Sequence, residues 1–359
     1  MKSGPFIHVS AVAPVGTDGR VVAADIQGQT RAVLAELSKS LDAAGSSLAR
    51  AASVHVYLRK ASDFAAMNEI YATHWTADPP VRTTVVAEPA HLDVLVEMSA
   101  VAIAPGAPRE VIHPSGWVKS PNPYSYGIKS GDTLFLAGLV SRSGRDNSDV
   151  PGDMATQTTT ALENGREILT AAGMSLSDVV SARVFITDGA GFQAMNESYR
   201  RFFPKDPPAR ATVICPLMRP SFLVEVTLVA VAGSDREVVA VPNADGTPRP
   251  ANPNLSPAIR VGDRVFVSGM LGNDATNKGD MAGQSRATLA ALGRALKAAG
   301  TDWSRVTDAI VYVTDTSRAA EVDAAWQEVF GPAAPTRTLV RTGLVAPDGL
   351  VEIMLNAKK

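Results

Sequence analysis

One sequence pattern occurs three times in this chain of 359 residues. An arginine follows a proline-rich turn into an apolar strand, and a glutamate stands fifteen residues later. The pairs are Arg82 and Glu97, Arg210 and Glu225, and Arg337 and Glu352. The arginines are spaced by 128 and then 127 residues, and Gln29, Gln157 and Gln284 keep this spacing. A fixed period of this length indicates tandem units, which we expect at residues 1–108, 109–235 and 236–359.

The second unit shows the order of elements most clearly. Residues 131–140 and 179–188 are rich in β-branched and aromatic residues and predict strands. Residues 154–173 carry apolar residues at helical spacing and end on glycine, and residues 192–203 repeat that spacing. Two apolar strands, at 211–217 and 222–232, complete the unit. Each unit is therefore expected to be α+β, a mixed sheet with two helices on one face.

Composition excludes several classes of protein. The net charge is −2, with 45% hydrophobic residues and neither a basic run nor a membrane-length apolar segment. We therefore expect no nucleic-acid or membrane partner. The single cysteine, Cys215, excludes an internal disulfide, and no zinc-binding spacing of cysteine or histidine occurs, so no metal is expected. The first residues do not resemble a signal peptide, and a cytoplasmic location is expected.

Several motifs together resemble those of the RidA/YjgF family of imine and enamine deaminases. They cover nearly all of the second and third units and most of the first. The motifs are GDTLFLAG and GDRVFVSG, the N-x-x-Y helix at Asn68–Tyr71 and Asn196–Tyr199, the P-x-R sequence before each strand, and the V-E strand with Glu97, Glu225 and Glu352.

The resemblance implies a fold and an assembly. Members of this family are usually single units with a chorismate-mutase-like fold, and three chains close around a threefold axis. A chain with three units is then similar to the whole trimer fused into one polypeptide, a monomer with a pseudo-threefold barrel and one cleft between each pair of units.

The resemblance also implies a reaction, the hydrolytic deamination of a small 2-imino or 2-enamine carboxylic acid to the 2-keto acid and ammonia. Arginine would hold the substrate carboxylate through its planar fork, and glutamate would activate water, without a metal or cofactor. The implied catalytic positions are the three repeated pairs, Arg82, Arg210, Arg337, Glu97, Glu225 and Glu352. The implied substrate-binding positions are Tyr124, Ser10, Gly138, Ser268, Gly269, Thr84, Thr212, Asn68 and Asn196.

The units depart from this pattern to different degrees. Only the second unit has the loop tyrosine, Tyr124, because the third has Leu255 there and the first lacks the segment. The third unit has Asp323 in place of the helix asparagine and Leu339 two residues after its arginine. We therefore expect three unequal clefts. The missing first strand segment of the first unit would leave a sheet edge that is covered or mobile.

Other interpretations remain open from the sequence. Each arginine could pair with a glutamate as a structural ion pair. The chain could be a deaminase or hydrolase of a larger or cyclic unsaturated carboxylate, or a carboxylate-binding protein without catalysis. Ribonuclease activity gains no support from the near-neutral charge. All five histidines lie in the first 113 residues, so inherited catalysis by histidine is not expected, and Cys215 is expected to be a buried apolar residue.

Overall fold

The computed structural model describes residues 1–359 and contains six α-helices in three pairs. Their bounds are α1 Ile26–Ala43, α2 Phe64–Ala72, α3 Met154–Ala171, α4 Phe192–Phe202, α5 Met281–Ala298 and α6 Ala319–Phe330. An aspartate caps the first helix of each pair. The side chains of Asp25, Asp153 and Asp280 accept hydrogen bonds from main-chain N–H groups of the first turn, which satisfies donors that have no partner within the helix.

Strand pairing produces three sheets, one for each unit. The first has the order β1-β2-β6-β3-β4, with β1 Lys2–Ser3, β2 Phe6–Val12, β3 Ala51–Leu58, β4 Val81–Val86 and β6 Val96–Ile103. The second has the order β18-β11-β10-β12-β9-β8-β7, with β7 Glu110–Ile112, β8 Gly127–Ser130, β9 Thr133–Leu136, β10 Val179–Ile186, β11 Ala209–Ile214 and β12 Val224–Val231. The third has the order β13-β14-β15-β19-β16-β17-β5, with β13 Glu237–Val239, β14 Ala258–Val261, β15 Arg264–Leu271, β16 Val306–Val313, β17 Thr336–Arg341 and β19 Val351–Lys358.

Short segments cross from one unit to the sheet of another. Strand β5 (Glu88–Pro89) of the first unit pairs with β17 of the third, and β18 (Gly343–Leu344) of the third unit pairs with β11 of the second. The main-chain N–H of Val86 donates to the carbonyl of Pro216, which joins the first unit to the second. The three sheets are thus linked at their edges. They do not form one continuous hydrogen-bonded sheet, so the expected barrel closure stays a prediction.

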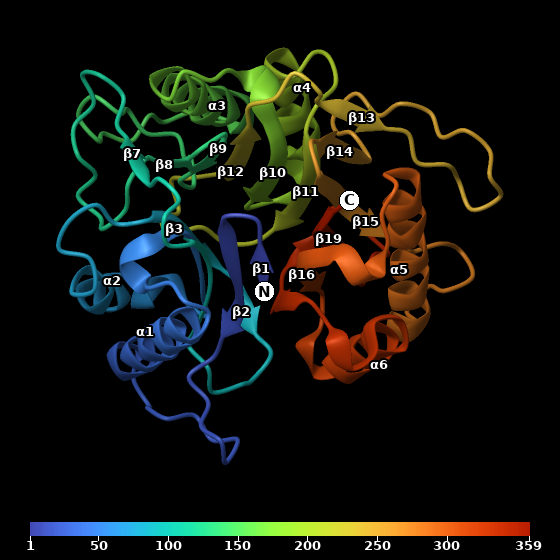
Figure 1. The fold of residues 1–359 in the computed structure, drawn as a ribbon, viewed down its shortest axis with the longest axis horizontal. Helices are drawn as coiled ribbons and strands as arrows, with labels where there is room; N and C mark the ends of the chain where they lie inside the picture. The colour runs from blue at the N-terminus through green and yellow to red at the C-terminus, as the bar shows by residue number, and fades with distance from the viewer.

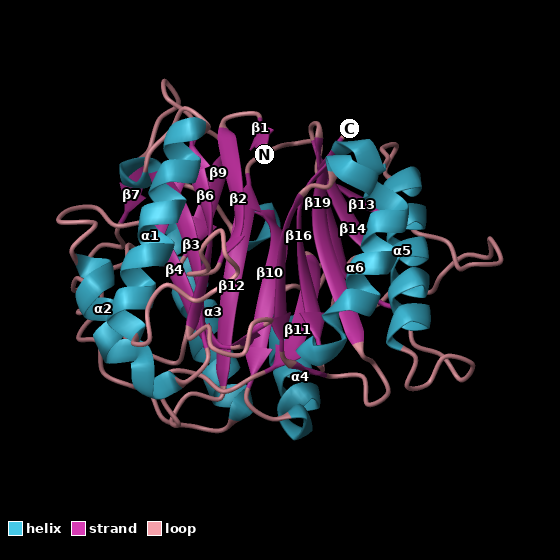
Figure 2. Cartoon of the chain, turned by 90° about the horizontal axis from the view of Figure 1, so that it is seen from below, coloured by secondary structure: helices cyan, strands magenta, loops and turns pink.

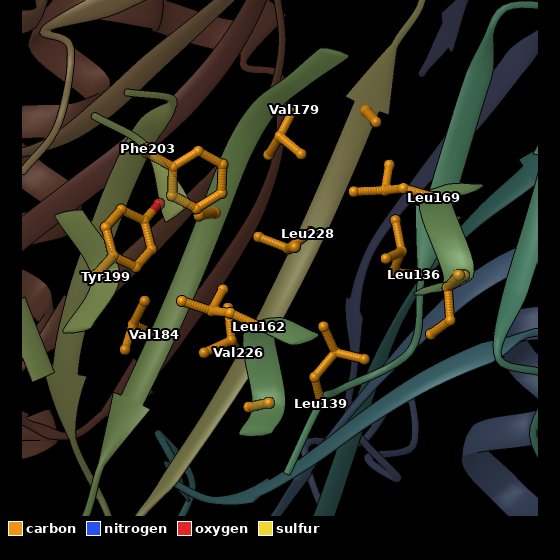
Figure 3. Close-up of a cluster of buried hydrophobic side chains, with 14 of the residues drawn as sticks. Leu136, Leu139, Leu162, Leu169, Val179, Val184, Tyr199, Phe203, Val226 and Leu228 are labelled. Atoms are coloured by element: carbon orange, nitrogen blue, oxygen red, sulfur yellow. The ribbon is translucent and has the colours of Figure 1, made fainter. Parts of the chain in front are cut away.

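The helices lie on the outside and the sheets face the centre of the molecule (Figures 1 and 2). A separate apolar core fills the space between each sheet and its helix pair. Figure 3 shows this core in the second unit, where Leu162 and Leu169 of α3 pack against strand residues such as Val226 and Leu228. A further cluster of 20 buried residues joins the inner faces of the sheets and includes Cys215, which is buried as expected.

The predicted order of elements in the second unit is confirmed, with one difference. Residues 131–140 were expected to form one strand, but β9 ends at Leu136. Beyond it the pairing is irregular, because Gly138 donates its main-chain N–H to the carbonyl of Arg82 in the first unit at 3.0 Å. The first and third units have register shifts at the equivalent place, between Val9 and Val12 and between Val267 and Met270. Such irregularities redirect the chain, here towards a neighbouring unit.

No helix of the chain combines the length and the apolar composition that crossing a membrane requires.

Candidate functional site

Each repeated arginine lies beside residues of the next unit in the sequence, and the third closes on the first. We name the three places the first cleft (Arg82 with Tyr124, Gly138 and Glu225), the second cleft (Arg210 with Ser268, Gly269 and Glu352) and the third cleft (Arg337 with Ser10, Ala11 and Glu97). Each of these pairs of units is joined by a hydrogen bond to the main chain of its arginine. Besides the Gly138–Arg82 bond, Ser268 Oγ accepts from the N–H of Arg210 at 2.8 Å, and Ser10 Oγ accepts from the N–H of Arg337 at 3.1 Å.

The first cleft holds a buried guanidinium without a protein partner. Arg82 is 5% exposed, its side chain makes no hydrogen bond, and its Nη1 is buried. Aromatic rings surround its Cζ, with centroids at 4.8 Å for Tyr71, 5.5 Å for Phe64 and 5.9 Å for Tyr124. Burial lowers the pKa of Arg82, although the neighbouring tyrosines and Glu225 oppose that shift. A desolvated cation with free N–H donors is suited to bind an anion.

The second cleft repeats this arrangement with one additional contact. The Arg210 side chain is buried, and one Nη donates to Asn196 Oδ1 at 2.7 Å, while Nε and Nη1 have no partner. The ring centroid of Tyr199 lies 4.6 Å from Cζ of Arg210. In the first cleft the equivalent asparagine, Asn68, instead donates to Asn122 Oδ1 at 3.3 Å. Arg82 is therefore the less restrained of the two arginines.

In each of these two clefts a buried threonine hydroxyl makes no hydrogen bond to the protein. The Oγ1 atoms of Thr84 and Thr212 are buried and make no hydrogen bond, and the same is true of the hydroxyls of Tyr71 and Tyr199. Buried polar groups are rarely left without partners. Their convergence near a free guanidinium indicates a place for a polar ligand.

The glutamates of these two clefts are buried, and their pKa values are raised. Burial raises the pKa of Glu225 to about 8, partly offset by the main-chain N–H of Thr84 and the charge of Arg82. Burial likewise raises the pKa of Glu352 to about 8, partly offset by Arg210 and the main-chain N–H of Thr212. Neither glutamate forms an ion pair with a repeated arginine, and the only one of these arginines in an ion pair is Arg337. The structural ion-pair interpretation is therefore wrong.

A missing side chain makes room for each of these carboxyl groups. A Cβ atom on Gly138 would lie 1.9 Å from Oε1 of Glu225, and one on Gly269 would lie 2.0 Å from Oε1 of Glu352. The first unit has Ala11 at the equivalent position. The Glu97 carboxyl therefore cannot take the same place beside β2 of its own unit.

The third cleft differs in its arginine as well. Arg337 donates to Asp323 Oδ1 at 2.5 Å and lies 5.2 Å from the ring centroid of Trp326. Its guanidinium is already paired with a carboxylate, so it is less available to a substrate. Burial raises the pKa of Glu97 to about 7, partly offset by Arg59. The expected inequality of the clefts is thus visible in the geometry of their residues.

Sequence reasoning did not assign a role to the repeated glutamines, although it used them as landmarks. Gln29, Gln157 and Gln284 lie on the first helix of each pair, and each holds the loop before the glutamate strand. Their Oε1 atoms accept from the N–H groups of Leu95, Leu223 and Leu350, at 2.7, 2.8 and 2.8 Å. Each of these leucines precedes a repeated glutamate by two residues, so the glutamines position the carboxyl groups. The identical spacing of glutamine and glutamate was the available signal.

Comparison with known proteins matches the chain in three consecutive segments. The sequence model of the family described as endoribonuclease L-PSP matches residues 1–104, 117–232 and 246–359. A RutC family protein of Sulfurisphaera tokodaii is 40% identical over 115 residues, which cover 32% of this chain and 92% of that protein. One from Saccharolobus solfataricus is 36% identical over 122 residues, covering 34% of this chain and 97% of that protein.

Two solved structures are also similar to the chain. A putative endoribonuclease of Thermotoga maritima is 31% identical and covers 35% of this chain and 98% of its own, with a TM-score of 0.33. A chorismatase covers 98% of this chain and 99% of its own at 14% identity, with a TM-score of 0.58, and shares the fold over the full length. The chain therefore belongs to the endoribonuclease L-PSP family, the RidA/YjgF family that its motifs resemble, and carries three tandem copies of the family unit.

Proposed function

We propose that the chain hydrolyses a small 2-imino or 2-enamine carboxylic acid to the 2-keto acid and ammonia in its first and second clefts. The observation that carries this proposal is the pairing of a buried arginine that has free N–H donors with a buried glutamate across a unit boundary. A substrate carboxylate satisfies the free N–H donors of Arg82 or Arg210, since a guanidinium binds a carboxylate through two parallel hydrogen bonds. The hydroxyl groups of Thr84 and Thr212 supply further contacts.

The raised pKa of the glutamates suits both proton transfers of this chemistry. With an enamine substrate, protonated Glu225 or Glu352 delivers its proton to the terminal carbon, and the enamine becomes the imine. The resulting carboxylate then takes a proton from water as the oxygen attacks the imine carbon. The same proton passes to the nitrogen, the C–N bond breaks, and ammonia leaves. The carboxylate takes the hydroxyl proton as the carbonyl forms, which returns the glutamate to its protonated state. A carboxyl group whose pKa lies near the working pH can serve as acid and base in turn.

The third cleft is not part of this proposal. Its arginine is held by Asp323, and its glutamate lacks the space that glycine provides in the other two clefts. Ser10 and Arg337 therefore contribute to the interface between the third and first units rather than to turnover.

The test is turnover of imines generated in the assay. An amino acid oxidase supplies 2-iminopropionate, semicarbazide traps the free imine, and the enzyme competes with the trap. We expect the protein to lower the initial rate of semicarbazone formation, because the imine reacts with semicarbazide faster than the pyruvate that hydrolysis produces. Imines with larger side chains, tested in the same assay, distinguish a small-substrate deaminase from one specialised for bulkier unsaturated carboxylates. A protein that binds pyruvate but converts no imine of any size would be a carboxylate-binding protein, and the proposal would be wrong.

A further inference from the structure

One large cavity of the chain lies outside the first and second clefts. It has a volume of about 700 Å³ and lies between the inner faces of the three sheets. Its lining includes Gly4, Gly131 and Lys358, so it reaches the end of the strands at which both chain termini lie (Figure 2). None of the arginines and glutamates of the first two clefts borders it, whereas Ser10 and Arg337 of the third cleft do. We call it the axial cavity.

Three equivalent strands face this cavity but present different side chains. The inward positions are Ser53, His55 and Tyr57 on β3, Ser181, Arg183 and Phe185 on β10, and Asp308, Ile310 and Tyr312 on β16. In a trimer of identical chains each layer would contain three copies of one residue. Fusion into one chain has allowed these layers to diverge, and a single arginine now faces the axis at the level of His55 and Ile310.

Arg183 is the cation of this cavity without an acidic partner. Arg264 is paired with Asp132, Lys358 with Asp263, and Arg337 with Asp323. The hydrogen-bond contacts of the Arg183 side chain go to the imidazole of His55, where Nη2 lies beside Nε2 and 3.2 Å from Nδ1. Burial, together with the charge of Arg183, holds the pKa of His55 well below its usual value, so His55 is a neutral partner. Nε and Nη1 of Arg183 make no hydrogen bond to the protein.

The remaining acidic group, Asp308, does not neutralise Arg183. Its carboxylate is occupied by three other donors: Asn356 Nδ2 at 2.9 Å, Thr307 Oγ1 at 3.0 Å and His8 Nδ1 at 3.2 Å. The positive charge of Arg183 therefore lacks a counter-charge within the protein.

Two buried hydroxyl groups in the same region also lack partners. Tyr57 and Tyr312 are each 1% exposed, and neither hydroxyl makes a hydrogen bond. The Tyr57 hydroxyl lies towards Arg183 and Ser99, but without hydrogen-bond geometry to either. Apolar side chains form other parts of the wall, among them Phe135, Phe266 and Met354. A cavity of this size with apolar walls and a few convergent polar groups is typical of a small-molecule site.

We propose that the axial cavity is a second binding site, separate from the first and second clefts, for a small organic carboxylate. Arg183 holds the carboxylate through its free N–H groups, the hydroxyl of Tyr57 adds a donor, and the apolar wall contacts the body of the ligand. The inference does not depend on deaminase activity, because none of its residues belongs to the first or second cleft.

The test measures binding of a carboxylate to a variant whose first and second clefts have lost their arginines. The probe is 4-fluorobenzoate, followed by ¹⁹F NMR, and the protein is the full chain carrying R82A and R210A. We expect saturable binding to this variant. Adding R183I should weaken it by at least about tenfold, since a charge-assisted contact is lost. Isoleucine is the matched replacement because Ile310 already occupies the equivalent position. R183Q, which keeps a polar side chain, provides a second variant should R183I fail to fold.

Three outcomes would overturn the inference. One is the absence of saturable binding in the R82A/R210A protein. Another is equal affinity with and without Arg183 in folded variants. The third is displacement of the probe by sulfate at equal concentration, which would show a general anion site without preference for an organic carboxylate. Imine turnover by the R183I single variant should match that of the wild type, which separates this inference from the proposed function.

Discussion

The main-chain N–H of Gly138 donates to the main-chain carbonyl of Arg82 at 3.0 Å, across the boundary between the second and first units. This one bond places the strand that carries the arginine against the strand that makes room for Glu225. Ser268 Oγ and the N–H of Arg210 hold the second cleft in the same way, at 2.8 Å. Each candidate site is therefore built at an interface, and neither half of it is complete within one unit.

Alanine at the two glycines should displace the glutamates. A Cβ atom on Gly138 or Gly269 would overlap the carboxyl group of Glu225 or Glu352 at about 2 Å. Because misplacement of a reacting group by 1 Å can cost about a hundredfold in rate, we expect G138A/G269A to lose most imine turnover in the trapping assay. The first unit offers the matched control, since A11G enlarges the third cleft and should leave turnover unchanged. Full activity in G138A/G269A would show that the glutamates need not lie where the structure places them.

Replacement of the glutamates should separate binding from turnover. In E225Q/E352Q the amide keeps the shape of a neutral carboxyl group but cannot exchange a proton with water or substrate. We expect turnover to fall by about a hundredfold or more, while calorimetry shows pyruvate binding within about threefold of the wild type. E97Q serves as the control and should retain both properties. Equal loss of binding and turnover would indicate that the glutamates hold the ligand instead of moving protons.

The stability of the fold should depend on pH through the same carboxyl groups. The pKa of Glu225 and of Glu352 is about 8 in the folded chain, above the usual value of 4.5. Between these values the folded state binds more protons than the unfolded state, so the free energy of unfolding falls as pH rises from about 5 to about 8. Urea denaturation at pH 5, 7 and 8.5 measures this slope.

E225Q/E352Q provides the comparison for that slope, since glutamine stays neutral at every pH. We expect its free energy of unfolding to fall less over this range, and to exceed the wild-type value at pH 8.5 by at least about 1 kcal/mol, the free energy of roughly one pKa unit. Parallel curves for the two proteins would mean that the carboxyl groups ionise in the folded state as they do in water.

Much of this architecture is predictable from the sequence because the chain repeats itself. The repeated arginines and glutamates, the helix at 154–173 and the strand at 179–188 follow from spacing and from helical and strand periodicity, and the structure has α3 and β10 there. The identity of the neighbours does not follow. Arg82 meets Glu225 and not Glu97 because of contacts between units, and such contacts leave no periodic signal.

The differences between the clefts were only partly predictable. The replacements at Asp323 and Leu339 are visible in the sequence, but the effect of Ala11 depends on the position of a carboxyl group in space. The sequence also offered no indication that Arg183 belongs to a binding site. In the sequence it is one polar residue in a strand, and its role depends on which residues face it from β3 and β16. The exchange of β5 and β18 between sheets was missed because two-residue strands carry no pattern of their own.

The chain should be a monomer in solution. The first unit supplies β5 to the third sheet, and the third unit supplies β18 to the second sheet. Each cleft is completed by two units of the same chain, so none of them needs a second chain. Multi-angle light scattering should give a mass near 37.6 kDa. A mass three times as large would show that the units assemble between chains, as separate single-unit proteins would have to.

The most direct test of the account is imine turnover by arginine variants of the individual clefts. Lysine keeps the charge but not the planar fork, so R82K or R210K should inactivate one cleft and leave the other working. We expect R82K/R210K to reduce turnover of 2-iminopropionate by about ten- to a hundredfold, the effect of one lost charge-assisted contact at each site. R337K should retain wild-type turnover, because Arg337 is already paired with Asp323. Undiminished turnover in R82K/R210K, or its loss in R337K, would contradict the assignment of function to the first and second clefts.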